Sequence, residues 1–290
     1  MRFLRKSPCD GFFGEGYGGR KVRFGLTRLA LCLLIGRVND MNGVKLFSGL
    51  CPACLLWAAS AQGGPPLLTD DPDTPGPNHW EINTGGTAQY EARQWEIGAP
   101  LLDMNYGVGE HIQLKYQTQV SELAPQQGGA RAGMGKSLAG VKWRFVDQTN
   151  ASWLEISTYP QLEFVYPGSS GRRGLADRGD NMLLPIEVEH IFKPLTVYAE
   201  GGYLWNEHRP KAAWYGLAGE YEFGEKFSLM GEFYGGFDRD FQNNGLSFNL
   251  GFRRTLTEHV ALIGSAGRGI FGPAERAPAF MSYLALQLTF

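Results

Sequence analysis

The sequence predicts an all-β fold, a transmembrane, antiparallel, up-and-down β-barrel of about 12 strands. From residue 78 to the C-terminus, segments of about ten residues alternate between apolar and polar side chains, which is the period of strands with one face in lipid. Only 19% of the residues are charged, a smaller share than in ordinary soluble domains. No apolar run reaches the roughly 20 residues that a membrane-spanning helix needs, and lipid otherwise admits only closed sheets. A secreted β-sandwich would alternate too, but it would not need so many aromatic residues at strand ends.

The last ten residues, 281–290, show the alternation most strictly. One face of the expected strand carries Leu284, Leu286, Leu288 and Phe290, and the other carries Tyr283, Ala285, Gln287 and Thr289. The stretch resembles the final strand of bacterial outer-membrane barrels, whose terminal aromatic residue is recognised by the barrel assembly machinery. The resemblance implies that machinery as a partner, with an assembly signal made of Phe290, Leu288, Leu286 and Tyr283. Ala285 stands where this signature commonly has glycine.

The remaining strands follow from the same alternation. We expect the twelve at residues 80–90, 96–106, 111–121, 138–145, 152–166, 182–191, 195–206, 213–223, 227–237, 246–254, 259–269 and 281–290. Short turns are expected at 107–110, 147–150, 192–194, 224–226 and 255–258, and longer glycine-rich loops include 123–137, 167–181 and 270–279. Short turns on one side and long loops on the other are typical of outer-membrane barrels, with the turns in the periplasm.

The inward face of the expected barrel carries charged and aromatic side chains that lipid would reject. The candidate lumen-lining residues are Lys115, Lys142, Arg144, Glu155, Glu163, Glu187, Glu200, Glu220, Glu232, Trp153, Tyr159, Tyr198, Trp214 and Tyr234. The bases lie on the third and fourth strands, and the acids dominate the fifth to ninth. This separation predicts either a transverse field across an open bore or ion pairs that hold a filled interior together, and the sequence leaves both open.

The N-terminal 61 residues are expected to be absent from the mature protein. Residues 41–61 have the features of a signal peptide, with a positive start at Lys45, an apolar stretch and a small-residue cleavage site near Ala61. Residues 1–40 are interpreted as an upstream extension from an over-long start, and a double or anchored leader is the alternative. All four cysteines precede the expected cleavage site, so the mature chain would contain neither a disulfide nor a thiolate metal site.

Residues 62–77 are rich in proline and aspartate and precede the barrel, which we place at 78–290. Five prolines exclude this stretch from a sheet interior, so it is a linker, a periplasmic tail or a segment folded against the barrel mouth. Asp70, Asp71 and Asp73 match no complete calcium loop, and a solvated turn is the simpler interpretation. We expect no cofactor and no metal.

Charge and motif content restrict the function. After cleavage the chain would keep 18 basic and 26 acidic residues, which gives no electrostatic basis for binding nucleic acid. Outer-membrane lipids are the expected surroundings. An outer-membrane lipid hydrolase would need a serine paired with a histidine. His190 and His259 both lie near expected turns, but no serine is clearly placed beside either, so we expect no enzyme.

Four stretches resemble the outer-membrane barrel family named after the meta-cleavage pathway of phenol degradation. They are residues 68–83, 100–107, 111–116 and 140–145. The resemblance extends over roughly 68–290 and implies a transporter for small solutes, among them aromatic or other hydrophobic compounds. It carries over no functional residues and leaves the solute unknown. The expected function is therefore a small-solute channel, and the alternatives are a lipid hydrolase or a closed structural or binding barrel without transport.

Overall fold

The computed structural model describes residues 64–148, 152–165, 173–175, 180–206, 212–238, 241, 243–274 and 276–290. The predicted upstream extension (1–40) and signal peptide (41–61), with its cleavage site at Ala61, lie outside the described residues. Among the described residues, no helix has both the length and the apolar character needed to cross a membrane.

The wall of the barrel is built of strands. The strands are β1 (Trp80–Glu91), β2 (Gln94–Val108), β3 (Ile112–Pro125), β4 (Arg131–Val146), β5 (Glu155–Thr158), β6 (Gln161–Phe164), β7 (Asn181–Ile191), β8 (Leu195–Asn206), β9 (Ala212–Glu222), β10 (Phe227–Asp238), β11 (Gly245–Thr257), β12 (Val260–Phe271) and β13 (Phe280–Thr289).

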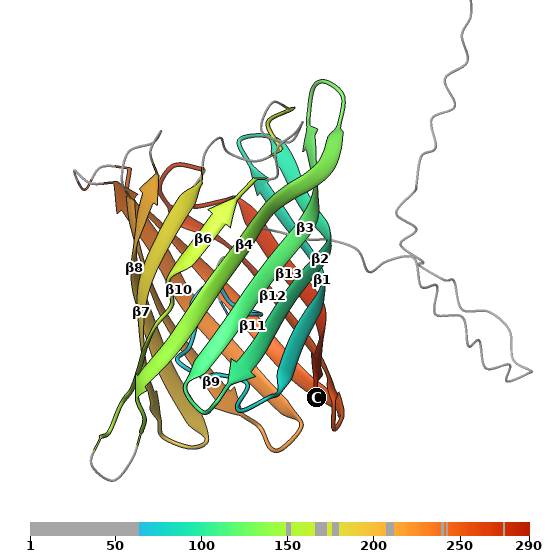
Figure 1. Ribbon diagram of the computed structural model, residues 1–290. Coiled ribbons are helices and arrows are strands. Elements are labelled where there is room, and N and C mark those ends of the chain that lie inside the picture. The colour runs from blue at the N-terminus through green and yellow to red at the C-terminus, as the bar shows by residue number, and fades with distance from the viewer. Residues whose placement is uncertain are drawn as a thin grey trace, which may run out of the picture. The chain divides into compact units, whose positions relative to one another are not determined.

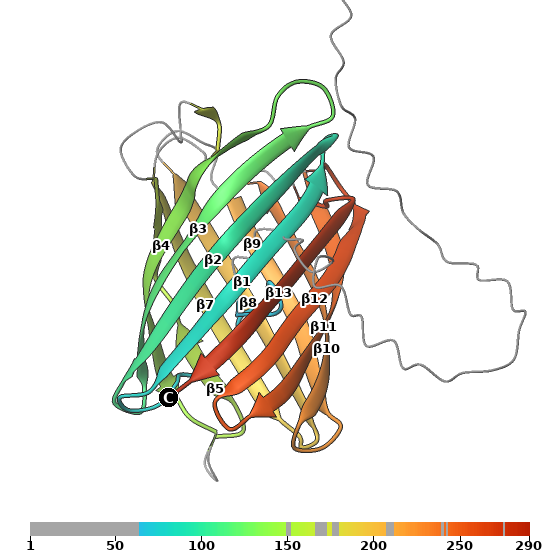
Figure 2. The same ribbon diagram turned by 90° about the vertical axis from the view of Figure 1, so that its right-hand side faces the viewer.

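The strands pair with their sequence neighbours in antiparallel fashion and close into a barrel (Figures 1 and 2). β1 pairs with β13 over ten residue pairs, from Glu81 opposite Thr289 to Tyr90 opposite Phe280. β5 and β6 succeed each other in one position, since both pair with β4 on one side and β7 on the other. The barrel therefore has twelve positions, and the predicted fold class is confirmed.

The break between β5 and β6 follows from two prolines. Pro160 separates the two short strands and has no N–H to donate. The carbonyl of Pro185, on the facing strand β7, accepts hydrogen bonds from Thr158 Oγ1 (2.8 Å) and from the Tyr159 N–H (3.4 Å). In a β-strand, the N–H and the C=O of one residue point toward the same neighbouring strand. Pro185 has no N–H, so it offers the Thr158–Tyr159 segment only its carbonyl. The predicted single strand at 152–166 is thus split.

The predicted strand at 138–145 is too short, because β4 begins seven residues earlier at Arg131. The predicted loop 123–137 is largely a hairpin in which Val120 pairs with Met134 and Leu123 with Arg131. Glycine and polar side chains suggested a loop, but this hairpin continues past the apolar band, where strands need no apolar face. Composition alone does not separate such strands from a loop.

Apolar side chains cover the outer surface as the alternation predicts. Leu217 and Trp143 are each 54% exposed, and Leu250 is 57% exposed. The polar side chains that alternate with the apolar ones along the strands point inward, and among them Lys142 and Glu232 are only 1% exposed. We call the end of the barrel that carries Phe290 and the β2–β3 connection the turn end. Aromatic pairs such as Trp80–Tyr106 and Tyr221–Phe223 lie there with ring centroids 4.7 Å apart.

Removal of Phe290 is expected to reduce assembly well beyond the loss of one side-chain contact. The Phe290 N–H donates to the Trp80 carbonyl (3.1 Å), and the Trp80 N–H donates to the Phe290 carbonyl (2.7 Å), so this residue ends the seam that leaves the sheet without an edge. Heat-modifiable electrophoretic migration of the membrane fraction measures the folded yield. Phe290→Ala separates the two contributions, because it keeps the main-chain pair with Trp80 and loses only the ring of the expected assembly signal. An unchanged folded yield after deletion would contradict the expectation.

Candidate functional site

Residues 64–79, here called the plug segment, run inside the barrel lumen before β1 begins. Figures 1 and 2 show this blue segment within the ring of strands. At the turn end it pairs with β2, since the Asn78 N–H donates to the Gly107 carbonyl (2.9 Å) and the Gly107 N–H donates to the His79 carbonyl (3.0 Å). A side chain at Gly107 would collide with the Gly76 carbonyl oxygen, 1.7 Å from the Cβ position. Of the three predicted interpretations of 62–77, the contacts favour a segment folded against the barrel, and they extend it to mid-height.

Glu232, near the middle of β10, holds the tip of the plug segment. Its carboxylate accepts the N–H of Leu68 (2.8 Å), the N–H of Thr69 (2.7 Å) and the Thr69 hydroxyl (2.7 Å). Asn249 Nδ2 on β11 donates to the same carboxylate at 3.0 Å. A buried carboxylate requires such donors, and hydrogen bonds to a charged group are stronger than those between neutral groups. Glu232 therefore ties two strands of the wall to the plug segment.

Two further wall residues bind the plug segment next to this tip. Glu200 on β8 accepts the Asp70 N–H at 3.1 Å and the Trp214 indole N–H at 2.8 Å. Lys142 Nζ on β4 lies 3.1 Å from Asp70 Oδ1 and 3.3 Å from Glu187 Oε2, and it donates to the Asp71 carbonyl. The Tyr159 ring lies 4.9 Å from the same ammonium. The Lys142 charge is thus shared between an acid of the plug segment and an acid of the wall.

Arg144 binds the plug segment at the turn end. Its guanidinium lies 2.8 Å from Asp73 Oδ1 on the plug segment and 3.4 Å from Glu155 Oε2 on β5. The same side chain reaches Asp147 at 2.9 Å and donates to the Glu110 carbonyl at 3.1 Å. The bases of β4 therefore lie against acids of the plug segment as well as acids of the wall.

An apolar contact accompanies these polar ones. Leu67 is fully buried in a cluster with Tyr198, Ala218 and Met230 of strands β8, β9 and β10. Ser265 Oγ on β12 donates to the Pro66 carbonyl at 2.5 Å. Burying one leucine side chain contributes about 2 kcal/mol. Together with Lys142 on β4, these contacts place the plug segment between wall strands on opposite sides of the lumen.

Asp71 has an unusual protonation equilibrium within this segment. Burial raises its pKa from 3.8 to about 7. The Lys142 ammonium opposes the shift, and the carboxylates of Asp70 and Asp73 add to it. Asp71 is therefore protonated at a higher pH than a free aspartate.

A small polar cavity of about 180 Å³ remains between the plug segment and the wall. Its lining includes Lys115, Lys142 and Arg253 from the wall and Asp70 and Asp73 from the plug segment. At ~30 Å³ per molecule, such a volume holds about six waters. This cavity suits water and small ions.

The structure places most of the predicted lumen residues on inward faces. Those that face inward are Lys115, Lys142, Arg144, Glu155, Glu163, Glu187, Glu200, Glu220, Glu232, Tyr159, Tyr198, Trp214 and Tyr234. Lys115 pairs with Asp103 on the adjacent strand at 3.3 Å. The prediction that Trp153 lines the lumen is wrong. This residue is 69% exposed and precedes β5, where no strand fixes its direction. Its ring meets that of His190 at 5.5 Å instead.

Sequence reasoning missed the residues of the plug segment that make the contacts, Leu67, Leu68 and Thr69. A weak signal was present: two leucines stand between prolines and aspartates, and a free linker has no need of them. The glycines that receive the segment gave no signal. A Cβ at Gly216 would lie 2.2 Å from Thr69 Oγ1, but nothing in the chain around Gly216 marks that approach.

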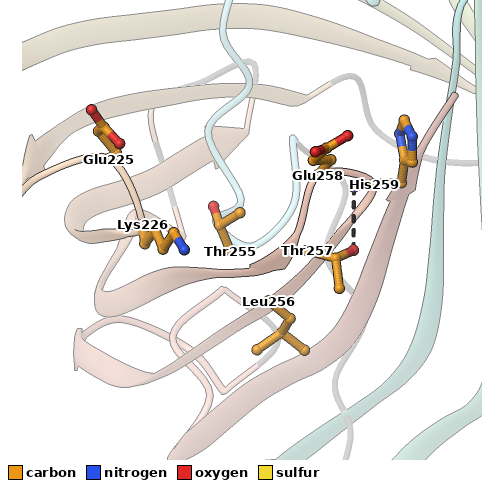
Figure 3. Close-up of a pocket in the computed structure, with 7 residues that line it drawn as sticks. All are labelled: Glu225, Lys226, Thr255, Leu256, Thr257, Glu258 and His259. Carbon is orange, nitrogen blue, oxygen red and sulfur yellow. Dashed lines mark hydrogen bonds between the residues drawn. The ribbon is translucent and has the colours of Figure 1, made fainter.

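The two histidines considered for lipid hydrolysis have other contacts. His190 Nδ1 bonds to the Trp153 carbonyl, and its ring meets Phe192 with centroids 4.0 Å apart. His259 lines a hollow of about 530 Å³ between the β9–β10 and β11–β12 connections, and its main-chain N–H donates to Thr257 Oγ1 at 3.3 Å (Figure 3). Within the described ranges, no serine hydroxyl bonds to either imidazole.

No protein-family model matches the chain, and a search of curated proteins finds no relative. Among solved structures it is similar to the COG4313 outer membrane channel from Pseudomonas putida F1, with a TM-score of 0.58 and 14% identity over 76% of this chain and 98% of that one. The chain has the fold of an outer-membrane barrel. The NanC porin is also similar, with a TM-score of 0.51 and 8% identity over 72% of this chain and 98% of the porin. Membership of the phenol-degradation family stays a prediction.

Gly216→Ala is expected to weaken docking of the plug segment. The new methyl would lie 2.2 Å from Thr69 Oγ1 and 2.9 Å from Thr69 Cβ. Overpacking of about 1–3 kcal/mol corresponds to roughly a 5- to 150-fold shift in the docking equilibrium. Limited proteolysis of the folded barrel should therefore cut residues 64–79 faster than in the native chain. Gly231→Ala is the matched control, because its methyl would meet nothing closer than 3.5 Å. Equal cleavage rates in the two variants would contradict this role of the contact.

Proposed function

We propose that the protein is an outer-membrane channel for small solutes, closed at rest by the plug segment. The observation that carries the proposal is the Glu232 carboxylate at mid-lumen, which binds main-chain N–H groups of Leu68 and Thr69 instead of a wall cation. Side chains that merely filled a permanently closed barrel would pair among themselves. Here Glu232, Glu200 and Lys142 each take one or more of their partners from a segment outside the sheet.

The composition of the lumen supports the same proposal. Water-soluble groups line the interior, and several of them, such as Lys142 and Glu200, contact the plug segment directly. Release of the segment would expose these groups to water and open a polar route. The docking contacts are hydrogen bonds and ion pairs, which water can replace, with one leucine as the main apolar contribution. Reversible release is therefore energetically accessible.

Aromatic or other small hydrophobic solutes are the substrate class we propose. The motivation is the resemblance described above together with apolar patches on the lumen wall. One such patch consists of Leu101, Ala261, Ile263, Tyr283 and Ala285 on β2, β12 and β13. A second surrounds Leu67. Once the segment moves, a solute with one apolar face would take the place of Leu67 against the second patch.

Transport rather than lipid hydrolysis is proposed, because neither histidine has a serine partner within the described ranges. The test is conduction by purified protein in planar bilayers, together with uptake of a small phenol and a small sugar by protein-containing liposomes. Faster entry of the phenol would support the substrate class. The absence of conductance both in the native chain and in Gly216→Ala would contradict a channel.

The current carried by the native chain is expected to be small and cation-selective. Inward acids such as Glu187, Glu200 and Glu220 outnumber the wall bases, so cations concentrate in the bore. Replacing Glu200, Glu220 and Glu232 together with glutamine should reduce the selectivity, and the effect should shrink near 1 M salt, where the Debye length is about 3 Å. Reversal potentials in a salt gradient measure the cation selectivity. Anion preference, or no change in the triple variant, would contradict it.

A further inference from the structure

Three carboxylates from separate parts of the chain meet at the turn end of the lumen. Asp73 belongs to the plug segment, Glu155 begins β5, and Glu189 lies near the end of β7. One oxygen of each lies within 4.8 Å of the others. Two ligands that share one Ca²⁺ at 2.4 Å are at most about 4.8 Å apart, so the spacing suits a common ion.

Glu189 gives the cluster a requirement that the protein alone does not meet. Its side chain is buried, with 4% exposed, and β-sheet pairing places it directly opposite Glu155. In the described part of the chain, no donor or cation contacts its carboxylate within hydrogen-bond or ion-pair distance. Arg144, the nearby base, is directed to Asp73, Glu155 and Asp147 instead. A buried carboxylate without a partner is costly, and either a proton or a bound cation removes that cost.

The donor set identifies the kind of cation. All three ligands are carboxylate oxygens, which hard divalent cations prefer, and the neighbouring His190 is engaged with the Trp153 carbonyl. Asp73 is exposed, so waters can fill the remaining positions that Ca²⁺ requires. The ligands lie on two strands and one irregular segment, and such an irregular arrangement suits Ca²⁺ better than Mg²⁺, which requires near-ideal octahedral geometry.

We propose that Asp73, Glu155 and Glu189 form a Ca²⁺ site that bridges the plug segment to the barrel wall. The ion would hold the turn end of the segment where Arg144 already contacts Asp73, and its removal would loosen that end first. Calcium binding can be measured without any current, so failure of this proposal is distinguishable from failure of the channel proposal. Only the consequence for gating rests on the channel proposal.

The test is calorimetric titration of CaCl₂ into protein refolded in detergent, since refolding avoids lipopolysaccharide, which itself binds divalent cations. One Ca²⁺ per chain is expected, with a dissociation constant on the order of 10⁻⁴–10⁻³ M, as in extracellular calcium modules. Glu189→Gln and Asp73→Asn should each weaken binding at least about tenfold. Glu220 is a lumenal acid outside the cluster and accepts a hydrogen bond from Ser228. Glu220→Gln should therefore bind Ca²⁺ as the native chain does.

Heat-modifiable migration verifies that each variant is folded, and Asp73→Asn keeps the test decisive if Glu189→Gln fails to fold, because Asp73 lies outside the wall. No saturable binding by the native chain would overturn the proposal. Equal binding in a folded Glu189→Gln variant would overturn the site, and unchanged binding in Asp73→Asn would overturn the bridge. Titration with MgCl₂ should give at least about tenfold weaker binding, and an equal or tighter Mg²⁺ response would overturn the assignment to Ca²⁺.

Discussion

The hydrogen bonds accepted by Glu232 are the interaction on which the arrangement of the lumen depends. This carboxylate lies at the middle of β10 and is almost fully buried. Within the described part of the chain no cation pairs with it, and three of its donors belong to Leu68 and Thr69. A buried carboxylate must have donors, so it is stable either with the plug segment docked or with water in its place. The wall and the plug segment are therefore energetically coupled.

Other contacts place the rest of the segment once its tip is fixed. Lys142 binds Asp70 next to the tip, and Arg144 binds Asp73 at the turn end. The prolines deprive the segment of main-chain donors that would otherwise need partners inside the barrel. They also restrict the undocked chain, which lowers the entropy lost on docking. Few favourable contacts are then enough to keep the segment in the lumen.

The barrel was predictable because its information is local. A two-residue period determines which side chains face lipid, and it placed Lys142, Glu187 and Glu232 correctly on the inward face. The same rule misplaced Trp153, since the parity was continued beyond the first residue of β5. Docking of residues 64–79 could not be predicted, because its contacts join residues far apart in the chain, such as Thr69 and Glu232, which are 163 positions apart. The meeting of Glu155 with Glu189 required the strand register, which alternation does not supply.

The most direct test of the account is the single-channel conductance of Glu232→Gln. Glutamine keeps the shape but turns one acceptor into a donor that faces the donors of Leu68 and Thr69, and each lost bond to a charged acceptor costs about 1.5–3 kcal/mol. The open fraction of Glu232→Gln should be at least tenfold larger than that of the native chain, and Glu220→Gln should remain native-like. A folded Glu232→Gln barrel with the native open fraction would show that this carboxylate does not hold the lumen closed.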